Sequence, residues 1–239
     1  MELIQTIRYK QPRIGSRKLF FLLYDDLQRV GKIGRDKFIS ILRNNNQLVV
    51  PKKSYTRTTN SFHRFYKYNN LLYNKTINRS NHCWVSDITY IRTERGFVYL
   101  FLITDYHSRK IVGWDLSNSL SIEGGIKALN MAIKQRSQGN QELIHHSDRG
   151  IQYCSNAYVG LLQKHNIKIS MTQENHCYEN AKAERVNGIL KDEFLLDSTF
   201  KDYTTAKKAS KQAIETYNEL RPHWSLNLQT PSQVHKKVA

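Results

Sequence analysis

The stretch from residue 81 onward constrains the fold most strongly, because apolar segments of strand length alternate there with segments of helical periodicity. Short turns separate three predicted strands, "WVSDITYIR" (84–92), "FVYLFLITDY" (97–106) and "KIVGWDLS" (110–117). The segments that follow are predicted, in order, as a helix at about 121–136, the strand "ELIHH", a helix near 155–166, the strand "IKISM" and a helix at about 179–196. An antiparallel meander followed by strand–helix alternation predicts an α/β fold, a mixed sheet flanked by helices on both faces.

Residues 1–50 are expected to form a small all-α domain in front of this sheet. Two helices are predicted, "GSRKLFFLLYDDL" with Ser16 as N-cap and "GRDKFISILRNNN" after it. The spacing fits a helix-turn-helix and equally an ordinary helical hairpin. Cations on or near the second helix favour the helix-turn-helix and contact with DNA, namely Arg35, Lys37 and Arg43.

The charge is strongly positive and unevenly distributed. The formal net charge is +17, and residues 1–80 hold 17 Lys and Arg against 4 acids. Within them, residues 51–80 carry seven Lys and Arg, no acid and several aromatic rings, which predicts a basic linker that either stacks on nucleic acid or serves as a solvated tether. A polyanion is the partner that such a surface favours, because neutralised phosphates release counterions. Nucleic acid is therefore expected ahead of an anionic membrane surface.

Three cysteines, Cys83, Cys154 and Cys177, are too few and too scattered for a disulfide framework or a structural zinc site. The pairs His82–Cys83 and His176–Cys177 are poor candidates for a shared metal ion, because neighbouring strand residues point to opposite faces. No apolar run reaches the ~20 residues that span a bilayer, and the first residues lack a signal-peptide core. We expect a cytoplasmic protein that has no membrane partner.

Three carboxylates stand at positions where chemistry is common. Asp87 is in the first predicted strand, Asp148 is at the C-terminal end of a short strand, and Glu184 lies off the apolar stripe of the last helix of the alternation. Hard cations such as Mg²⁺ prefer oxygen ligands, and two of them can activate an attacking oxygen and stabilise a leaving one in phosphoryl transfer. Ordinary exposed or salt-bridged acids remain the alternative at this point.

The order of elements is that of the ribonuclease H-like fold, which other α/β domains share. Five segments go further: "WVSDITYIRT", "GFVYLFLITDYHSRKIVGW", "HSDRGIQYCS", "NHCYENAKAERVNGILKDE" and "YNELRPHWSLNLQTP". In this order they resemble the catalytic subunit of bacterial insertion-sequence transposases, the second-frame (OrfB) type with a retroviral-integrase-like core. The resemblance implies that Asp87, Asp148 and Glu184 form the catalytic and metal-binding DDE triad. The intervals of 60 and 35 residues agree with it.

The resemblance also suggests roles for neighbouring residues and a domain plan. Lys191 matches a basic residue that touches terminal DNA, and a solvated helix cation is the alternative. Asn180 and Asn187 either fix the start of the helix or contact the substrate. His146 and Arg149 border Asp148 and either orient it or contact phosphate, with satisfied polar groups of the turn as the alternative. The expected domains are a helix-turn-helix domain (1–50), a basic linker (51–80), a ribonuclease H-like catalytic core (81–200) and a C-terminal helical extension (201–239). Glu179 departs from the aspartate that is usual in the family, which keeps the charge.

The implied activity is that of a transposase that nicks DNA at the ends of an insertion sequence and transfers the freed 3′-hydroxyl to another phosphodiester. Two Mg²⁺ ions, or Mn²⁺, are the expected cofactors. The expected partners are double-stranded DNA of the element ends and the target, the product of the upstream overlapping frame, and further copies of the chain. Such a protein would work in the bacterial cytoplasm, on the nucleoid when bound to DNA. The alternative is a DNA-binding protein with an inactive or domesticated core.

Overall fold

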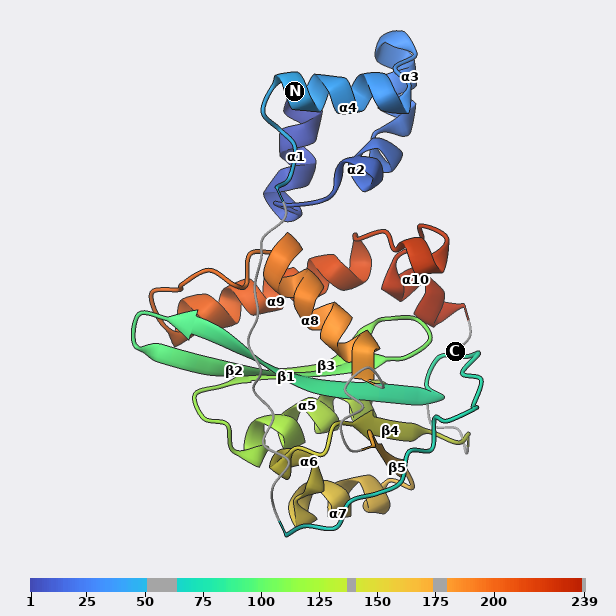
Figure 1. Ribbon diagram of the computed structural model, residues 1–239, viewed down its shortest axis with the longest axis vertical. Coiled ribbons are helices and arrows are strands. Elements are labelled where there is room, and N and C mark those ends of the chain that lie inside the picture. Colours follow the sequence, from blue (N-terminus) through green and yellow to red (C-terminus); the bar gives the residue numbers. More distant parts are fainter. Residues whose placement is uncertain (51–63, 137–140, 174–179, 238–239) are drawn as a thin grey trace.

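The computed structural model describes residues 1–50, 64–136, 141–173 and 180–237. The first fifty form an all-helical domain that stands apart from the sheet (Figure 1). Its helices are α1 (Glu2–Lys10), α2 (Ser16–Leu22), α3 (Tyr24–Gly31) and α4 (Arg35–Asn44). They enclose a small apolar cluster of Ile4, Ile14, Leu19, Leu23, Phe38 and Leu42. The expected all-α region is thus confirmed, while its helix-turn-helix function stays a prediction.

Two local predictions for this domain were wrong. The segment expected to be one helix is divided at Leu23, whose φ of −100° and ψ of 6° depart from helical values between α2 and α3. The N-cap of α2 is Gly15, and Ser16 is the first helical residue.

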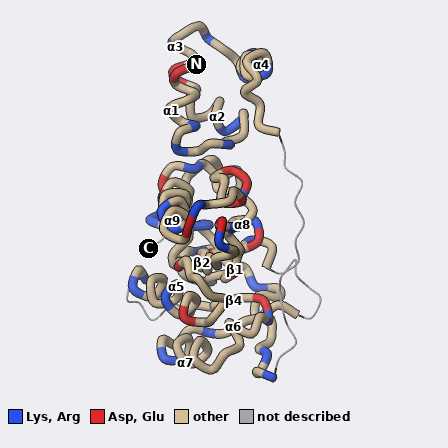
Figure 2. Tube along the Cα trace, turned by 90° about the vertical axis from the view of Figure 1, so that its left-hand side faces the viewer, with Lys and Arg blue, Asp and Glu red and all other residues tan. Residues whose placement is uncertain are grey.

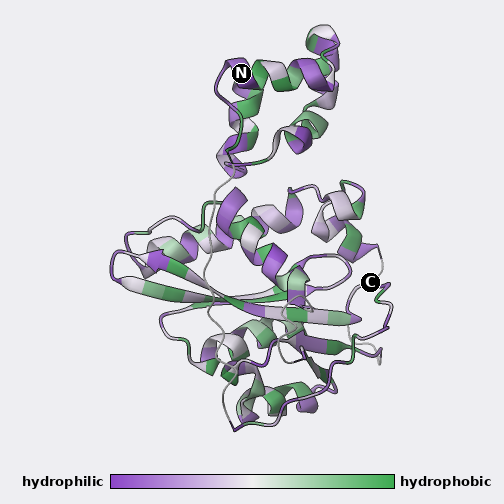
Figure 3. Cartoon of the chain, viewed as in Figure 1, coloured by the Kyte–Doolittle hydropathy of each residue, from purple (hydrophilic) through white to green (hydrophobic). Residues whose placement is uncertain are grey.

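The predicted mixed sheet is confirmed, with five strands in the order β3-β2-β1-β4-β5. The strands are β1 (Cys83–Thr93), β2 (Gly96–Asp105), β3 (Ile111–Ser117), β4 (Ile144–Ser147) and β5 (Lys168–Met171). The first three pair antiparallel, whereas β4 runs parallel to both β1 and β5. Figure 3 shows hydrophobic residues along the strands and on the sides of the helices that cover them.

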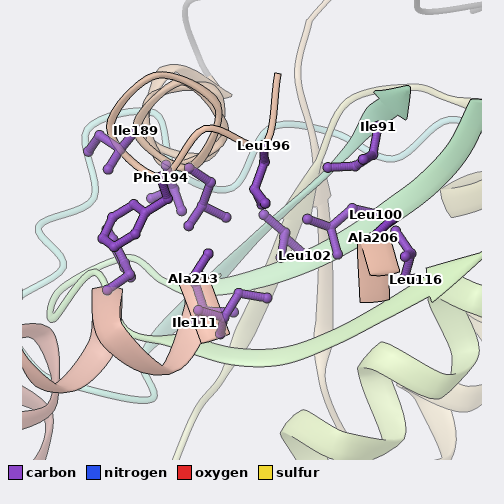
Figure 4. Packing of buried hydrophobic residues seen from close by; sticks show 14 of the residues in the cluster. Ile91, Leu100, Leu102, Ile111, Leu116, Ile189, Phe194, Leu196, Ala206 and Ala213 are labelled. Atoms are coloured by element: carbon purple, nitrogen blue, oxygen red, sulfur yellow. The ribbon is translucent and has the colours of Figure 1, made fainter. Parts of the chain in front are cut away.

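Helices cover both faces of the sheet. One face packs on α5 (Ile122–Gln135), α6 (Ile151–Cys154) and α7 (Asn156–Lys164). Gly113 in β3 permits the close approach of α5, since a Cβ there would lie 2.1 Å from the carbonyl oxygen of Ala128. The other face packs on α8 (Ala181–Glu193) and α9 (Tyr203–Glu219). Leu100, Leu102 and Ile111 from the strands meet Phe194, Leu196 and Ala213 in this second core (Figure 4).

The chain after α9 is folded back onto α9, and α9 itself contacts the edge of the sheet. A 3₁₀ turn (Trp224–Leu226) leads to α10 (Pro231–Lys236), whose start is closed by a capping box between Thr230 and Gln233. Asn218 extends the edge of β3, because its side chain accepts a bond from Ile111 N (2.9 Å) and donates one to Ile111 O (3.0 Å). The family-signature residue Tyr217 donates to Arg109 O (3.0 Å). Tyr217 and Asn218 therefore attach α9 to β3 and to the turn that precedes β3.

The described part of the predicted basic linker, residues 64–80, lies against the core. Phe65 and Tyr68 pack on one face of the sheet, and Leu72 packs on the other. Two hydrogen bonds tie the segment to β5: Met171 N donates to Asn69 O (3.4 Å), and Leu71 N donates to the side-chain hydroxyl of Ser170 (2.8 Å). An edge strand with unpaired backbone groups accounts for this attachment. The free-tether interpretation is therefore wrong for these residues, and residues 51–63 lie outside the described part.

Among the described residues, no helix is long and apolar enough to span a bilayer. Lys and Arg are spread over the helical domain and the core alike (Figure 2). Of the three cysteines, Cys83 and Cys154 are buried free thiols, and Cys177 lies outside the described residues together with His176 and Glu179.

Candidate active site

The register of two parallel strands brings Asp87 and Asp148 to the same level of the sheet. Val85 of β1 pairs with His146 of β4, and each aspartate is two residues further along its strand direction. Since side chains alternate between faces, both carboxyl groups are directed to the face that holds Cys83, Val85 and Ile144, which α8 covers through Ala183. Both aspartates are half-buried.

Backbone bonds orient the two carboxyl groups. Asp87 Oδ1 accepts from Ile88 N (2.9 Å), and Asp148 Oδ1 accepts from Gly150 N (3.0 Å). Gly150 allows this tight turn at the start of α6, because a Cβ at that position would lie 2.9 Å from Asp148 Oδ1. The turn chemistry of the segment "HSDRG" therefore presents the aspartate at the strand end, as the sequence predicted.

Helix α8 supplies the third carboxylate from above the sheet. Its buried face consists of Ala183, Val186, Asn187, Ile189 and Leu190. Glu184 falls outside that face and is exposed at the flank of the helix. Lys191, seven residues further, shares this flank and is half-buried. Glu184 is thus at the edge of the covered sheet, as predicted.

Two amides fasten α8 to the strand that carries Asp87. Asn180 Nδ2 donates to Ser86 O (3.0 Å), and Asn187 Nδ2 donates to Asp87 Oδ2 (2.7 Å). Both asparagines are buried, with 3% and 6% exposure. Direct DNA contact, one of the two interpretations made from sequence, disagrees with this burial, whereas the fixing of the helix agrees with it.

The electrostatics of the site link the three carboxyl groups. Burial, together with the charges of Asp148 and Glu184, raises the pKa of Asp87 to about 7, although the hydrogen bonds from Ile88 N and Asn187 lower it. Burial also raises the pKa of Glu184, again with a contribution from Asp148. The cluster therefore resists ionisation until a cation compensates its charge, which is the electrostatic condition of a site for a hard divalent ion.

The donor set fits Mg²⁺ or Mn²⁺, because all three groups offer carboxylate oxygens and favour a nearby positive charge. In the part of the chain that the structure describes, no three His, Cys, Asp or Glu side chains are close enough to hold an ion as they stand. The charge of Asp148 thus raises the pKa of Asp87 and Glu184, although the three carboxyl groups do not surround a common ion position as they stand.

The remaining residues predicted for DNA binding occupy different surroundings. Burial lowers the pKa of Lys191 and the charges of Asp87 and Asp197 oppose this, so the amine is near the acidic site. Arg149 is half-buried in the turn after Asp148. His146 is fully buried, and its Nδ1 lies 2.8 Å from the hydroxyl of Ser170. Contact between His146 and phosphate therefore disagrees with the structure, because the ring is enclosed by strands and by the bound segment 64–80.

The three cations of the helical domain are exposed on α4: Arg35, Lys37 and Arg43. Arg35 pairs with its exposed neighbour Asp36, with 2.8 Å between Nε and Oδ1. Such a surface pair is weak and leaves the guanidinium able to exchange partners.

A buried hydrogen-bond group under the site was missed from sequence. The Nε2 atom of His145 lies 2.6 Å from Ser86 Oγ and 2.9 Å from Tyr158 Oη. Burial lowers the pKa of His145 to about 3, so the ring is neutral. The group connects β1, β4 and α7 on the face of the sheet opposite the Asp87 side chain. In the sequence, this hydrogen-bond group is indicated only by the alternation of side chains along a strand, which directs His145 and His146 to opposite faces.

Comparisons with known proteins agree with this geometry. Two profiles described as integrase core domain match residues 77–177 and 165–231. The chain is 34% identical to the uncharacterized 31 kDa protein of insertion element IS600 from Shigella sonnei, over 86% of the chain and 76% of that protein. It is 35% identical to the transposase InsF of insertion sequence IS3A from Escherichia coli K12, over 66% of the chain but only 54% of InsF.

Two solved structures share the fold. The HTLV-2 integrase catalytic core domain in complex with magnesium superimposes with a TM-score of 0.52 at 22% identity, covering 66% of this chain and 97% of the other. The simian T-cell lymphotropic virus intasome in complex with the PP2A regulatory subunit B56 gamma gives a TM-score of 0.56 at 19% identity, covering 92% and 74%. At these identities the likeness concerns the fold alone.

The fold and the arrangement of carboxylates on β1, β4 and α8 define an integrase-type core. The chain belongs to the family of insertion-sequence transposases that carry this core. It spans about half the length of the InsF transposases and about three quarters of the IS600 protein.

Proposed function

We propose that the chain is a DNA strand transferase that cleaves one strand at each end of an insertion sequence and joins the freed 3′-hydroxyl to another phosphodiester. The observation that carries the proposal is the position of Asp87 and Asp148 at the same level of adjacent parallel strands, with Glu184 on the helix that covers them. The charge of Asp148 raises the pKa of both Asp87 and Glu184. The membership in a transposase family supports the choice of DNA as substrate.

Asp87, Asp148 and Glu184 are the residues that would hold divalent cations, with Mg²⁺ first and Mn²⁺ second. Two such ions, when bound, activate an attacking oxygen and stabilise the leaving one. A structural neighbour was solved with magnesium, which supports the metal. The protein itself contributes the fixed direction of the carboxyl groups, through Ile88 N, Gly150 N and the amide of Asn187. No covalent link between protein and DNA is needed.

The DNA would lie along the flank of α8 that carries Glu184. Lys191 on this flank and Arg149 beside Asp148 are cations that are suited to phosphate contacts. The exposed cations of α4, namely Arg35, Lys37 and Arg43, would contact duplex DNA from the helical domain. The net charge of +17 supports a polyanionic partner.

Two DNA ends have to be held together, so at least two copies of the chain are expected on the DNA. The resemblance to the second-frame subunit makes the product of the upstream frame the expected protein partner. Work on DNA would take place in the bacterial cytoplasm. The alternative function, DNA binding by an inactive core, needs only the basic surface.

A strand-transfer assay separates these functions. A labelled duplex with the DNA that flanks the source gene is incubated with Mg²⁺ and either the natural chain, Asp148→Asn, or the control Glu123→Gln. Glu123 is an exposed acid on α5, which covers the opposite face of the sheet. Joined products from the natural chain and the control, and none from Asp148→Asn, are expected. Nicking without joining would indicate a nuclease, and binding without either would favour the inactive core.

A further inference from the structure

The helical domain rests on the last turn of α8 (Figure 1). Arg13 N donates to Glu193 O (3.1 Å), and Arg13 Nη1 lies 2.8 Å from Asp192 Oδ1. Gln11 Nε2 donates to Leu220 O (3.4 Å) at the end of α9. The loop between α1 and α2 is therefore attached to the same helix that carries Glu184 and Lys191.

A buried ion cluster closes this contact. Arg221 binds Glu193 through two bonds, Nε to Oε2 (2.8 Å) and Nη2 to Oε1 (2.7 Å). Lys18 of α2 reaches the same carboxylate, with Nζ 3.1 Å from Oε1 and 3.4 Å from Oε2. Lys18 is 8% exposed and Arg221 is 2% exposed. Two buried cations thus share one carboxylate, and only Lys18 comes from the helical domain.

The contact relies on polar groups. The apolar cluster of the helical domain and the apolar cluster under α8 and α9 have no residue in common among the described residues. Each part therefore has its own core, and the ion pairs of Lys18 and Arg13 hold the two together. Figure 2 shows charged positions of α1 and α2 on the side that meets the core.

The attachment leaves the catalytic flank of α8 open. Successive helical residues are rotated by about 100°, so Lys191 comes back to the flank of Glu184 while Glu193 lies on the opposite side of the helix. A domain bound at Glu193 thus does not cover Glu184 or Lys191. This geometry suits a domain that guides DNA toward the site and does not suit one that blocks it.

We propose that Lys18 and Glu193 are positioning residues that fix the helical domain on the catalytic helix, so that DNA held by the domain enters the site in one register. The inference rests on the proposed strand-transfer function. The Glu193 carboxylate acts through the domain it holds, and its two bonds from Arg221 lie within the core and do not involve Lys18.

The first test measures the attachment alone. Spin labels are placed at Val30→Cys in α3 and Lys208→Cys in α9, both exposed, in a chain in which Cys177→Ser removes a competing thiol. One narrow distance distribution is expected for this chain and for the control Lys32→Met, which removes a cation from an exposed loop of the same domain. A broad distribution is expected for Lys18→Met. A narrow distribution in Lys18→Met, or a broad one in the parent chain, would overturn the proposal.

The second test measures the consequence. Lys18→Met and Lys32→Met should bind the end duplex with equal affinity, since each loses one cation. The rate of joining at saturating DNA should fall at least about tenfold in Lys18→Met alone, because a displaced reactant loses its productive alignment. A loss of affinity confined to Lys18→Met, or an unchanged joining rate, would contradict the positioning role. Should the parent chain join no DNA, the proposed function fails, and the distance measurement still decides the attachment.

Discussion

Asp87→Asn is expected to stabilise the protein in the absence of divalent metal while it abolishes strand transfer. The ordinary pKa of an aspartate is 3.8, and burial together with the charges of Asp148 and Glu184 raises that of Asp87 to about 7. The folded protein therefore holds this proton more tightly than the unfolded chain does. Between pH 3.8 and about pH 7 the folding stability falls as the pH rises, because the Asp87 carboxyl group ionises more easily in the unfolded chain.

The size of the effect follows from the two pKa values. Their difference, at about 1.4 kcal/mol per pKa unit, gives up to about 4 kcal/mol of destabilisation above pH 7. An asparagine at this position carries no charge to desolvate. Its amide also finds a partner, since Asn187 Oδ1 has no hydrogen-bond partner among the described residues. A gain of roughly 2–4 kcal/mol at pH 8 is therefore expected for the variant, less the strain of reorienting Asn187.

Urea unfolding in EDTA between pH 5 and pH 8.5 measures this gain. The stability of the natural chain should fall over that range more steeply than that of Asp87→Asn, and the two curves should approach each other at low pH. Added Mg²⁺ should stabilise the natural chain and have no such effect on the variant. Equal pH dependence of the two proteins, or a variant less stable at pH 8, would refute the proposed electrostatics of the site.

Gly113→Ala should cost about 2–3 kcal/mol of stability through the clash with Ala128 O, whereas Gly160→Ala, on the exposed side of α7 with open space around it, should gain about 0.5–1 kcal/mol; urea midpoints compare the two. Glu184→Gln should lose joined products while its circular dichroism spectrum stays unchanged, and a spectrum that changes would make the residue structural. Lys191→Gln should weaken binding to any duplex and reduce the slope of log affinity against log salt by about 1. A slope that does not change would remove Lys191 from the phosphate contacts.

The catalytic part of the fold could be predicted because its signals are local. Alternating and continuous apolar segments define β1 to β5. Once β1 and β4 are known to be parallel neighbours, it follows that Asp87 and Asp148 lie at the same level of the sheet. The flank position of Glu184 follows from the apolar stripe of α8 alone. The resemblance to transposases then selected these three acids from the others.

Contacts between distant segments could not be predicted in this way. Lys18 and Glu193 are 175 residues apart, and nothing in either segment indicates the other. Ser170 is an ordinary strand residue in sequence, yet it binds both His146 and the backbone of Leu71. Polar pairs of this kind depend on which surfaces the fold brings together. The periodicity of apolar residues in a single sequence predicts helices and strands, but it does not predict which distant polar residues meet.

The direct test of the account is a crystal structure of the chain with Mn²⁺, in which the anomalous signal of the metal locates every bound ion. The account predicts a peak between Asp87 and Asp148, with Glu184 as a ligand of the same site, and no such peak in Asp148→Asn crystals. Metal absent from these carboxylates at saturating Mn²⁺, or bound only elsewhere on the protein, would contradict a metal-dependent active site at this position.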